Sequence, residues 1–398
     1  MTRYVNCKPL RTRRLNVMKF KSLSLLLVVI CSCVLLTGCL GTSVASKGWS
    51  GPVTSNGSLY VGSMSGKVIA FDDIGDGGSH FIKWRYPDET VISYIYSDPV
   101  IDNGYVYIGC YNGKVYVLNA SRGYREWIYP SDDYLGAIVG SPAVVDGTLY
   151  FGSSDKKLYA INTTTREQEQ AWQQPFETGG KIWSTPVVYN GTVYVGSFDH
   201  KLYAVDAESG SELWEFSSGG AIVGTPIIYN DAIYFGSLDQ KFYAVDIATG
   251  ALKEGFTPFK ADNWFWGKAV AYNGNIIAAS LDGKLYALDA ESGNKLWEAE
   301  TGGIIRGTPA LVNNRVVVGT DEGSSRGRVY CYDADTGERL WLYPSEEVDP
   351  MYAIHASIGS NGSVVYVHTT NQKIYAFDVE QIGAEARYLW TTSTGGGE

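Results

Sequence analysis

The sequence is poor in the residues that most often carry catalysis or bind metals. It contains four histidines in 398 residues, and no two of them have the spacing of a zinc site. Of its six cysteines, four lie within the first 39 residues, so that only Cys110 and Cys331 remain beyond them. These two fall in non-neighbouring copies of a repeat described below. We therefore expect two structural thiols and no disulfide framework.

Basic residues are scarce outside the N-terminal segment. The chain has 32 basic and 42 acidic residues, and seven of the basic ones but none of the acidic ones lie in the first 38 positions. This leaves 25 basic against 42 acidic residues, a formal charge of −17. We expect no nucleic-acid partner, because phosphate binding needs a basic surface. Anionic lipid headgroups would not attract such a chain either.

The first 38 residues have the layout of a signal peptide. Basic residues precede an apolar run from Leu23 to Leu36, which is too short for a membrane-spanning helix. The run ends at Leu36-Thr37-Gly38-Cys39, which resembles the bacterial lipobox, and this resemblance implies cleavage before Cys39 and acylation of its thiol. Met18 is an alternative start, because Lys19 and Lys21 would still supply the basic region.

These features predict a signal peptide at 1–38 and a lipidated tether at 39–48. The protein would then be held by its lipid at an extracytoplasmic membrane surface, either the periplasmic face of an outer membrane or the cell surface. An uncleaved anchor helix is the alternative, and it also places the remaining chain outside the cytoplasm.

One sequence unit recurs eight times between residues 49 and 392. Asn-Gly-like pairs such as Asn190-Gly191 mark a tight hairpin in each copy. Between the turns, β-branched and aromatic residues alternate, which predicts four short strands per copy, and no segment has a sustained helical period. Equivalent acidic or amide residues recur at intervals of 40 to 47 positions, at Asp72, Asn119, Asn162, Asp206, Asp246, Asp289, Asp333 and Asp378.

A single four-stranded sheet of this size cannot bury its own faces, so each copy must stack on its neighbours. Radial stacking predicts an all-β, eight-bladed β-propeller of four-stranded antiparallel blades over residues 49–392. We expect residues 393–398 to form a disordered tail. The first repeat starts on an inner strand and the last ends on an outer one, which indicates closure by packing without strand exchange.

The Asp-to-Trp part of the repeat resembles the tryptophan-docking motif of the pyrroloquinoline-quinone (PQQ) propeller superfamily, Ala-x-Asp-x-x-Thr/Ser-Gly-x-x-x-Trp. It stands as Ala204-x-Asp206-x-x-Ser209-Gly210-x-x-x-Trp214, and again from Ala287 to Trp297. The resemblance implies that each indole packs on the neighbouring blade. Structural docking is therefore expected of Trp84, Trp127, Trp172, Trp214, Trp297, Trp341 and Trp390.

The superfamily has an enzymatic and a non-enzymatic branch. Quinoprotein dehydrogenases use adjacent cysteines beside the quinone, a Ca²⁺ ion and a catalytic Asp, and residues 40–398 contain no adjacent cysteines. The other branch includes BamB-like lipoproteins of outer-membrane protein assembly. The resemblance thus implies a monomeric protein-binding scaffold that is not an enzyme and holds no PQQ, Ca²⁺ or other metal. A PQQ-dependent dehydrogenase and a cell-surface polysaccharide-binding protein are the alternatives.

One position is equivalent in every repeat but chemically varied. It lies three residues before the Pro, or its equivalent, that opens the innermost strand. We expect its side chains to ring the mouth of the central channel, where aromatic faces and a cationic sector could hold an aromatic ligand or a partner loop. The alternative is that the aromatic residues only plug the channel. The position holds Trp49, Tyr96, Val139, Trp183, Val223, Trp266 and the cationic pair Arg306 and His355.

Three loops between repeats share the pattern Trp-x-Tyr-Pro followed by acidic residues. They follow repeats 1, 2 and 7, which ring closure places on one side, so they predict an acidic arc on the face of the ring. The arc is either a docking edge for a basic segment, with binding that weakens in salt, or solvated loop charge. Its acidic residues are Asp88, Glu89, Asp132, Asp133, Glu346 and Glu347.

Overall fold

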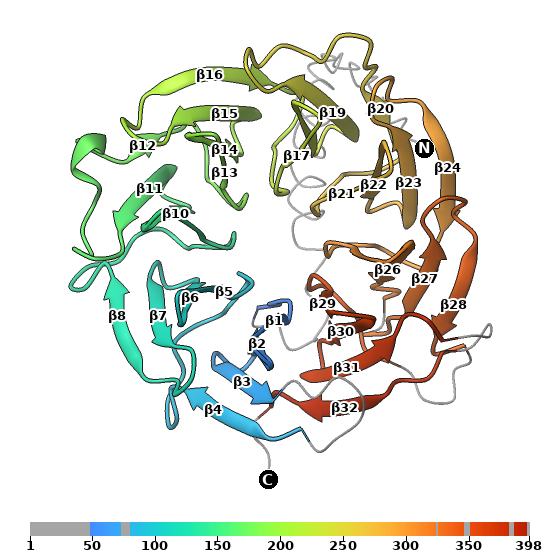
Figure 1. Cartoon of the computed structure of the whole chain (residues 1–398), viewed down its shortest axis with the longest axis horizontal. Coiled ribbons are helices and arrows are strands. Elements are labelled where there is room, and N and C mark those ends of the chain that lie inside the picture. Colours follow the sequence, from blue (N-terminus) through green and yellow to red (C-terminus); the bar gives the residue numbers. More distant parts are fainter. Residues whose placement is uncertain (1–47, 73–79, 324, 346–350, 382–385, 396–398) are drawn as a thin grey trace, which may run out of the picture. The chain divides into compact units, whose positions relative to one another are not determined.

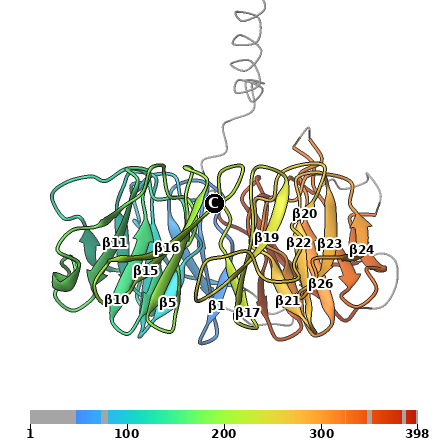
Figure 2. The ribbon, with the colours of Figure 1, turned by 90° about the horizontal axis from the view of Figure 1, so that it is seen from above.

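The computed structural model describes residues 48–72, 80–323, 325–345, 351–381 and 386–395. Eight four-stranded sheets surround a common centre, and each consists of four consecutive antiparallel strands, the first innermost and the fourth outermost (Figure 1). Figure 2 shows these blades edge-on, standing side by side in a disc. The predicted eight-bladed all-β propeller is confirmed. The part of the chain that the structure describes contains one short helix, η1 (Gln170–Trp172).

Blades 1 to 4 contain strands β1 to β16. Their bounds are β1 (Val53–Ser55), β2 (Ser58–Gly62), β3 (Val68–Asp72), β4 (Ile82–Tyr86), β5 (Val100–Asp102), β6 (Tyr105–Gly109), β7 (Val115–Asn119), β8 (Arg125–Tyr129), β9 (Ala143–Val145), β10 (Thr148–Gly152), β11 (Lys157–Asn162), β12 (Phe176–Glu177), β13 (Val187–Tyr189), β14 (Thr192–Gly196), β15 (Lys201–Asp206) and β16 (Glu212–Ser217).

Blades 5 to 8 contain strands β17 to β32. Their bounds are β17 (Ile227–Tyr229), β18 (Ala232–Gly236), β19 (Lys241–Asp246), β20 (Phe259–Lys260), β21 (Val270–Tyr272), β22 (Asn275–Ala279), β23 (Lys284–Asp289), β24 (Lys295–Glu300), β25 (Ala310–Val312), β26 (Arg315–Gly319), β27 (Val329–Asp333), β28 (Arg339–Tyr343), β29 (Gly359–Asn361), β30 (Val364–His368), β31 (Lys373–Asp378) and β32 (Trp390–Ser393).

The two middle strands of a blade are buried on both faces. In blade 4, β14 and β15 each contain four consecutive buried residues, whereas the outer strand β16 alternates between exposed and partly buried positions. In this blade, alternation between more and less exposed side chains is therefore found in the outer strand and not in the two middle strands. The middle strands lack it because a neighbouring blade covers each of their faces.

The hydrophobic core consists of eight clusters, and each joins two neighbouring blades. Between blades 3 and 4, for example, Tyr150 and Trp172 pack with Val193 and Val195. A cluster of the same kind joins the last blade to the first, where β32 lies beside β4 (Figure 1). The ring thus closes by packing, without exchange of a strand between its ends.

A tryptophan from one blade docks on a turn of the next. The indole Nε1 of Trp172 donates a hydrogen bond of 3.0 Å to the carbonyl of Ala207, and a Cβ atom on Gly210 would lie 2.6 Å from the indole Cδ2. Gly210 also has a φ of +72°, so both the contact and the backbone require glycine there. Equivalent hydrogen bonds join Trp84 to Ala120, Trp214 to Ile247, Trp297 to Ala334 and Trp341 to Val379.

Three blades depart from this docking contact. Trp127 is buried and packs edge-on against Tyr107 of its own blade. Trp390 stacks on His80, with 3.6 Å between ring centroids. Blade 5 has no equivalent tryptophan, and Phe256 contacts Gly293 of blade 6 instead.

The seam between blades 8 and 1 reverses a pairing that the other seams share. The second strand of the other blades ends in Gly or Ala, and a large apolar residue from the next blade covers it. A Cβ atom on Gly62, for example, would lie 2.4 Å from Cγ2 of Ile95. In the last seam the second strand β30 ends in His368, and the residue equivalent to Ile95 is Gly48.

His368 connects the two ends of the ring. Its side chain is 3 % exposed; its Nδ1 donates to the carbonyl of Ser50 at 3.0 Å, and its Nε2 lies 3.0 Å from the hydroxyl of Thr394. Thr394 is itself buried and β32 ends at Ser393, so blade 8 extends past the expected boundary at residue 392.

The predicted N-terminal features lie outside the described residues. These features are the signal peptide at 1–38, the lipidated Cys39 and all of the tether except Gly48. Within the described ranges, no helix has the length and apolar character needed to cross a membrane. Cys110 and Cys331 are free, buried thiols in blades 2 and 7, and burial raises the pKa of both.

His368 predicts a pH-dependent stability of the ring. Burial lowers its pKa from 6.5 to about 4. Between these pH values the unfolded state therefore binds a proton at this imidazole that the folded state does not bind. The contribution of the neutral His368 imidazole to the free energy of unfolding is complete above pH 6.5 and is lost as pH falls towards 4. We expect this loss to reach about 3 kcal/mol. Urea unfolding of wild type and His368→Gln between pH 7 and 4.5 measures it, and the variant should lose less stability. The exposed His200→Gln is the control, and an unchanged pH dependence in His368→Gln would contradict the prediction.

Trp172→Ala should destabilise the propeller by about 3–5 kcal/mol, because it removes a buried indole and leaves a cavity in one seam. Trp264, which is 43 % exposed, is the matched control, and Trp264→Ala should cost less than about 1 kcal/mol. Urea unfolding of the two variants at pH 7 gives the comparison. Equal losses would show that interblade docking of Trp172 is not a main source of stability.

Candidate axial binding site

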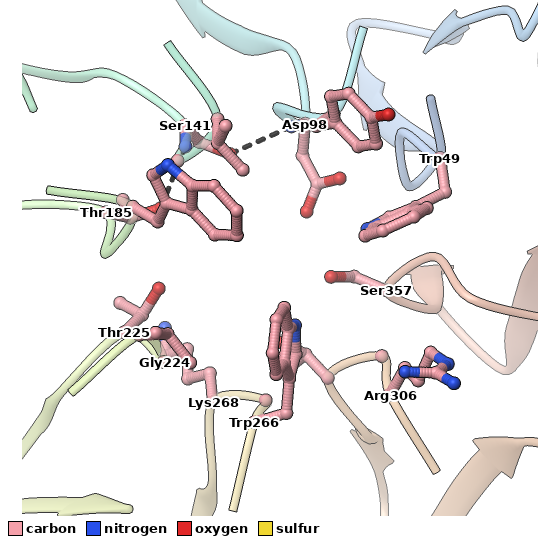
Figure 3. Close-up of a pocket in the computed structure, with 18 of the residues that line it drawn as sticks. Trp49, Asp98, Ser141, Thr185, Gly224, Thr225, Trp266, Lys268, Arg306 and Ser357 are labelled. Atoms are coloured by element: carbon pink, nitrogen blue, oxygen red, sulfur yellow. Dashed lines mark hydrogen bonds between the residues drawn. The ribbon is translucent and has the colours of Figure 1, made fainter. Parts of the chain in front are cut away.

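All eight residues at the varied position of the repeat line one cavity of about 440 Å³. Each lies on the segment that leads into the inner strand of its blade, and in blades 2 to 8 this segment comes from the outer strand of the preceding blade. Because every blade contributes one such segment, the register of the repeat brings these side chains together at the centre. Figure 3 shows Trp49, Trp266 and Arg306 on different sides of the cavity.

The aromatic members form two groups on opposite sides of the ring. Trp49 of blade 1 packs edge-on against Tyr96 of blade 2, at 4.6 Å between centroids, and against His355 of blade 8 at 5.5 Å. Trp183 of blade 4 and Trp266 of blade 6 form the other group, at 6.5 Å and 62°. The cavity therefore offers two aromatic walls to an occupant.

A carboxylate that was not predicted from the sequence lies beside the predicted cationic sector. Oδ2 of Asp321 lies 3.0 Å from Nε2 of His355 and 3.7 Å from Nε of Arg306. The hydrogen bond to His355 is the main reason why the pKa of Asp321 falls to about 2. The carboxylate is thus ionised at neutral pH and offsets the positive charge of this sector.

A second ring of side chains also lines the cavity, two residues after the first. Its backbone N–H groups donate to side chains of the following blade: Asp98 N–H to Ser141 Oγ at 2.8 Å, and Ser141 N–H to Thr185 Oγ1 at 2.9 Å. Figure 3 shows this chain of contacts along one wall. The ring consists of Asp98, Ser141, Thr185, Thr225, Lys268, Thr308 and Ser357, and Gly51 holds the equivalent position in blade 1 without contributing a side chain.

Two members of this second ring have ionisable side chains. Asp98 of blade 2 and Lys268 of blade 6 stand four blades apart, on opposite walls. Burial raises the pKa of Asp98, which accepts hydrogen bonds from Gly51 N–H and from Ser357. Lys268 is exposed to the channel, yet the surrounding protein lowers its pKa. Comparison of the repeats at this position could have singled out both residues, because most copies carry Ser or Thr there.

The acidic loops are exposed where the structure describes them. This holds for the side chains of Asp88, Glu89, Asp132 and Asp133, whereas Glu346 and Glu347 lie outside the described residues. Lys114 is hydrogen-bonded to one of these loops: its Nζ donates to the carbonyls of Pro130 and Ser131, both at 3.1 Å. The acidic arc and its role stay a prediction.

The cavity residues do not fit a calcium-bound quinone. Ca²⁺ takes six to eight oxygen ligands, with carboxylates prominent among them. Among the described residues that line the cavity, Asp98 alone carries a carboxylate. Within the described part of the chain, no three His, Cys, Asp or Glu side chains are grouped so that they could hold a metal ion.

Many solved structures share the fold, and three of them serve as examples. They are a computationally designed protein, Ika8 (15 % identity, TM-score 0.68, covering 83 % of this chain and 96 % of that one), BamB from Moraxella catarrhalis (18 %, 0.66, 84 % and 95 %), and a quinohemoprotein alcohol dehydrogenase from Pseudomonas putida (17 %, 0.61, 83 % and 70 %). At such low identity these similarities show the fold alone. No curated protein matches the sequence.

The sequence itself matches a known family over most of its length. The profile of the family described as outer membrane protein assembly factor BamB matches residues 37–168, 165–253 and 257–391. These three matches span all eight blades, which agrees with the tryptophan-docking motifs of the repeat. The chain therefore belongs to the outer membrane protein assembly factor BamB family.

Proposed function

We propose that this protein is a non-enzymatic scaffold that binds protein partners at an extracytoplasmic membrane surface, anchored there by lipid on Cys39. Membership of the BamB family and the signal-peptide layout of residues 1–38 support this assignment. The observation that carries it is the axial cavity, where a uniform repeat presents eight residues of five types around one hollow.

The aromatic surface of the cavity continues onto the outer face of the propeller. Tyr111 lines the cavity and packs on Tyr96 at 5.6 Å and on Tyr94 at 6.1 Å between centroids. Tyr94 and Tyr111 are 43 % and 45 % exposed. Exposed tyrosines and tryptophans around a hollow are typical of protein-binding surfaces, because they offer large apolar contact with little loss of conformational entropy.

The dehydrogenase alternative has weaker support. A quinoprotein shares the fold, but fold does not determine function. The chain beyond residue 39 has no adjacent cysteines, and a single carboxylate among the described lining residues is a poor match to a bound Ca²⁺. The aromatic walls suit a binding role as they stand.

Affinity purification from membranes with mass spectrometry tests the scaffold. We expect wild type to retain a specific membrane protein, and the double variant Trp183→Ala/Trp266→Ala to lose at least about tenfold of it, because both indoles of one cavity wall are removed. Trp264→Ala, which removes an exposed tryptophan outside the cavity lining, should bind as wild type does.

Two results would contradict the proposal. One is the absence of any protein that co-purifies specifically with wild type. The other is alcohol oxidation by the protein after reconstitution with PQQ and Ca²⁺, which would assign it to the enzymatic branch. If a partner binds equally well to the double variant, the scaffold stands but its docking surface lies elsewhere.

A further inference from the structure

We propose that the axial cavity receives a carboxylate carried beside an aromatic or apolar group on a segment of the partner protein, and that Lys268 recognises this carboxylate. The inference rests on the proposed function and adds the chemistry of the bound segment. Lys268 is then a specificity-determining residue, and the neighbouring tryptophans supply the apolar contact.

Lys268 lacks the acceptor role that its ring position has in blades 2, 3 and 4. Ser141 and Thr185 occupy the same position in blades 3 and 4, and their hydroxyls accept the backbone N–H of the preceding blade. Asp98 keeps this role, since its carboxylate accepts the N–H of Gly51. An ammonium group has no lone pair and cannot accept such a bond. The lysine therefore does not serve the contact between blades that the fold uses at this position.

Lys268 also lacks a counter-charge within the protein. Some lysines on the strands are paired, as in Lys201 with Glu215 at 2.7 Å and Lys284 with Glu298 at 3.7 Å, whereas others at the outer surface have no ion pair among the described residues. In the part of the chain that the structure describes, no ion pair or hydrogen bond of the Lys268 side chain is found. The carboxylate of Asp98 belongs to the opposite wall. A cation in a partly desolvated hollow is stabilised by a carboxylate that enters with a ligand.

The other basic side chains of the cavity are already engaged. Arg306 and His355 share the carboxylate of Asp321. An entering anion would have to compete with that carboxylate at their wall but not at Lys268. The geometry thus directs the carboxylate of a ligand towards blade 6.

The residues around Lys268 define what should accompany the carboxylate. Trp266 precedes Lys268 by two positions on the same segment and packs at 62° to Trp183. A flat or branched apolar group next to a carboxylate would contact these indoles while the carboxylate meets the ammonium (Figure 3).

The shape of the aromatic surface favours an extended occupant. From Trp49 and Tyr96 inside the cavity, ring contacts lead to Tyr111 and on to the exposed Tyr94. A compact molecule of the size of the cavity would leave this outer stretch uncovered. A polypeptide segment whose tip enters the cavity would cover both parts.

A matched pair of probes tests the recognition of the carboxylate. Calorimetric titration of the full-length protein with N-acetyl-tryptophan and with N-acetyl-tryptophanamide compares ligands that differ in the charge of one group. We expect the acid to bind at least about tenfold more tightly than the amide. Lys268→Met should abolish this preference, Lys268→Arg should keep it, and Lys260→Met on the outer strand β20 should leave it unchanged.

Several outcomes would overturn the inference. Equal affinity of wild type for acid and amide, no binding of either up to about 10 mM, or a preference that survives in Lys268→Met would each exclude Lys268 as the recognising group. Co-purification of the partner separates the remaining cases. If Lys268→Met loses the preference for the acid probe yet retains the partner at wild-type yield, the pocket serves a free carboxylate and not a partner segment, while the scaffold itself stands. If wild type retains no partner, the proposed function fails instead.

Discussion

The packing of each blade on the next is the interaction on which the rest of the structure depends. Every hydrophobic cluster of the described residues crosses a seam between two blades. Strands of two to six residues make sheets too small to bury their own faces, so a middle strand such as β15 is covered only when both neighbours are present. Stability is therefore a property of the closed ring, and the seam that closes it matters as much as any other.

The closing seam differs from the other seven because no chain connection joins its two blades. Elsewhere the chain runs directly from one blade into the next, whereas here residues 48–50 and 393–394 of the first and last blades meet without such a connection. An isoleucine in place of His368 could pack in the seam, but it could not donate to the carbonyl of Ser50. The histidine does both and also contacts Thr394, so one buried side chain holds the two ends to β30.

The sequence allowed most of the fold and part of the site to be predicted, for a physical reason. Turn geometry is local: Asn190 has the φ of +48° that its Asn-Gly pair indicates. The axial ring follows from register, because equivalent positions of stacked repeats must meet at the axis. Asp321 could not be found in this way, since it lies in an irregular connection of blade 7 and meets His355 of blade 8. The role of His368 was equally hidden, because its partners Ser50 and Thr394 lie 318 and 26 positions away from it in the sequence.

Exceptions in a repeat separate into two kinds once their surroundings are known. His368 is an exception that the fold compensates, through two polar contacts. Asp98 is also compensated, since a carboxylate oxygen replaces the hydroxyl as acceptor. Lys268 gives up the acceptor role, and the described residues supply no partner for its charge. A structural origin accounts for the first two. We propose that the third serves a ligand bound in the channel, and this makes blade 6 the part of the propeller to test first for function.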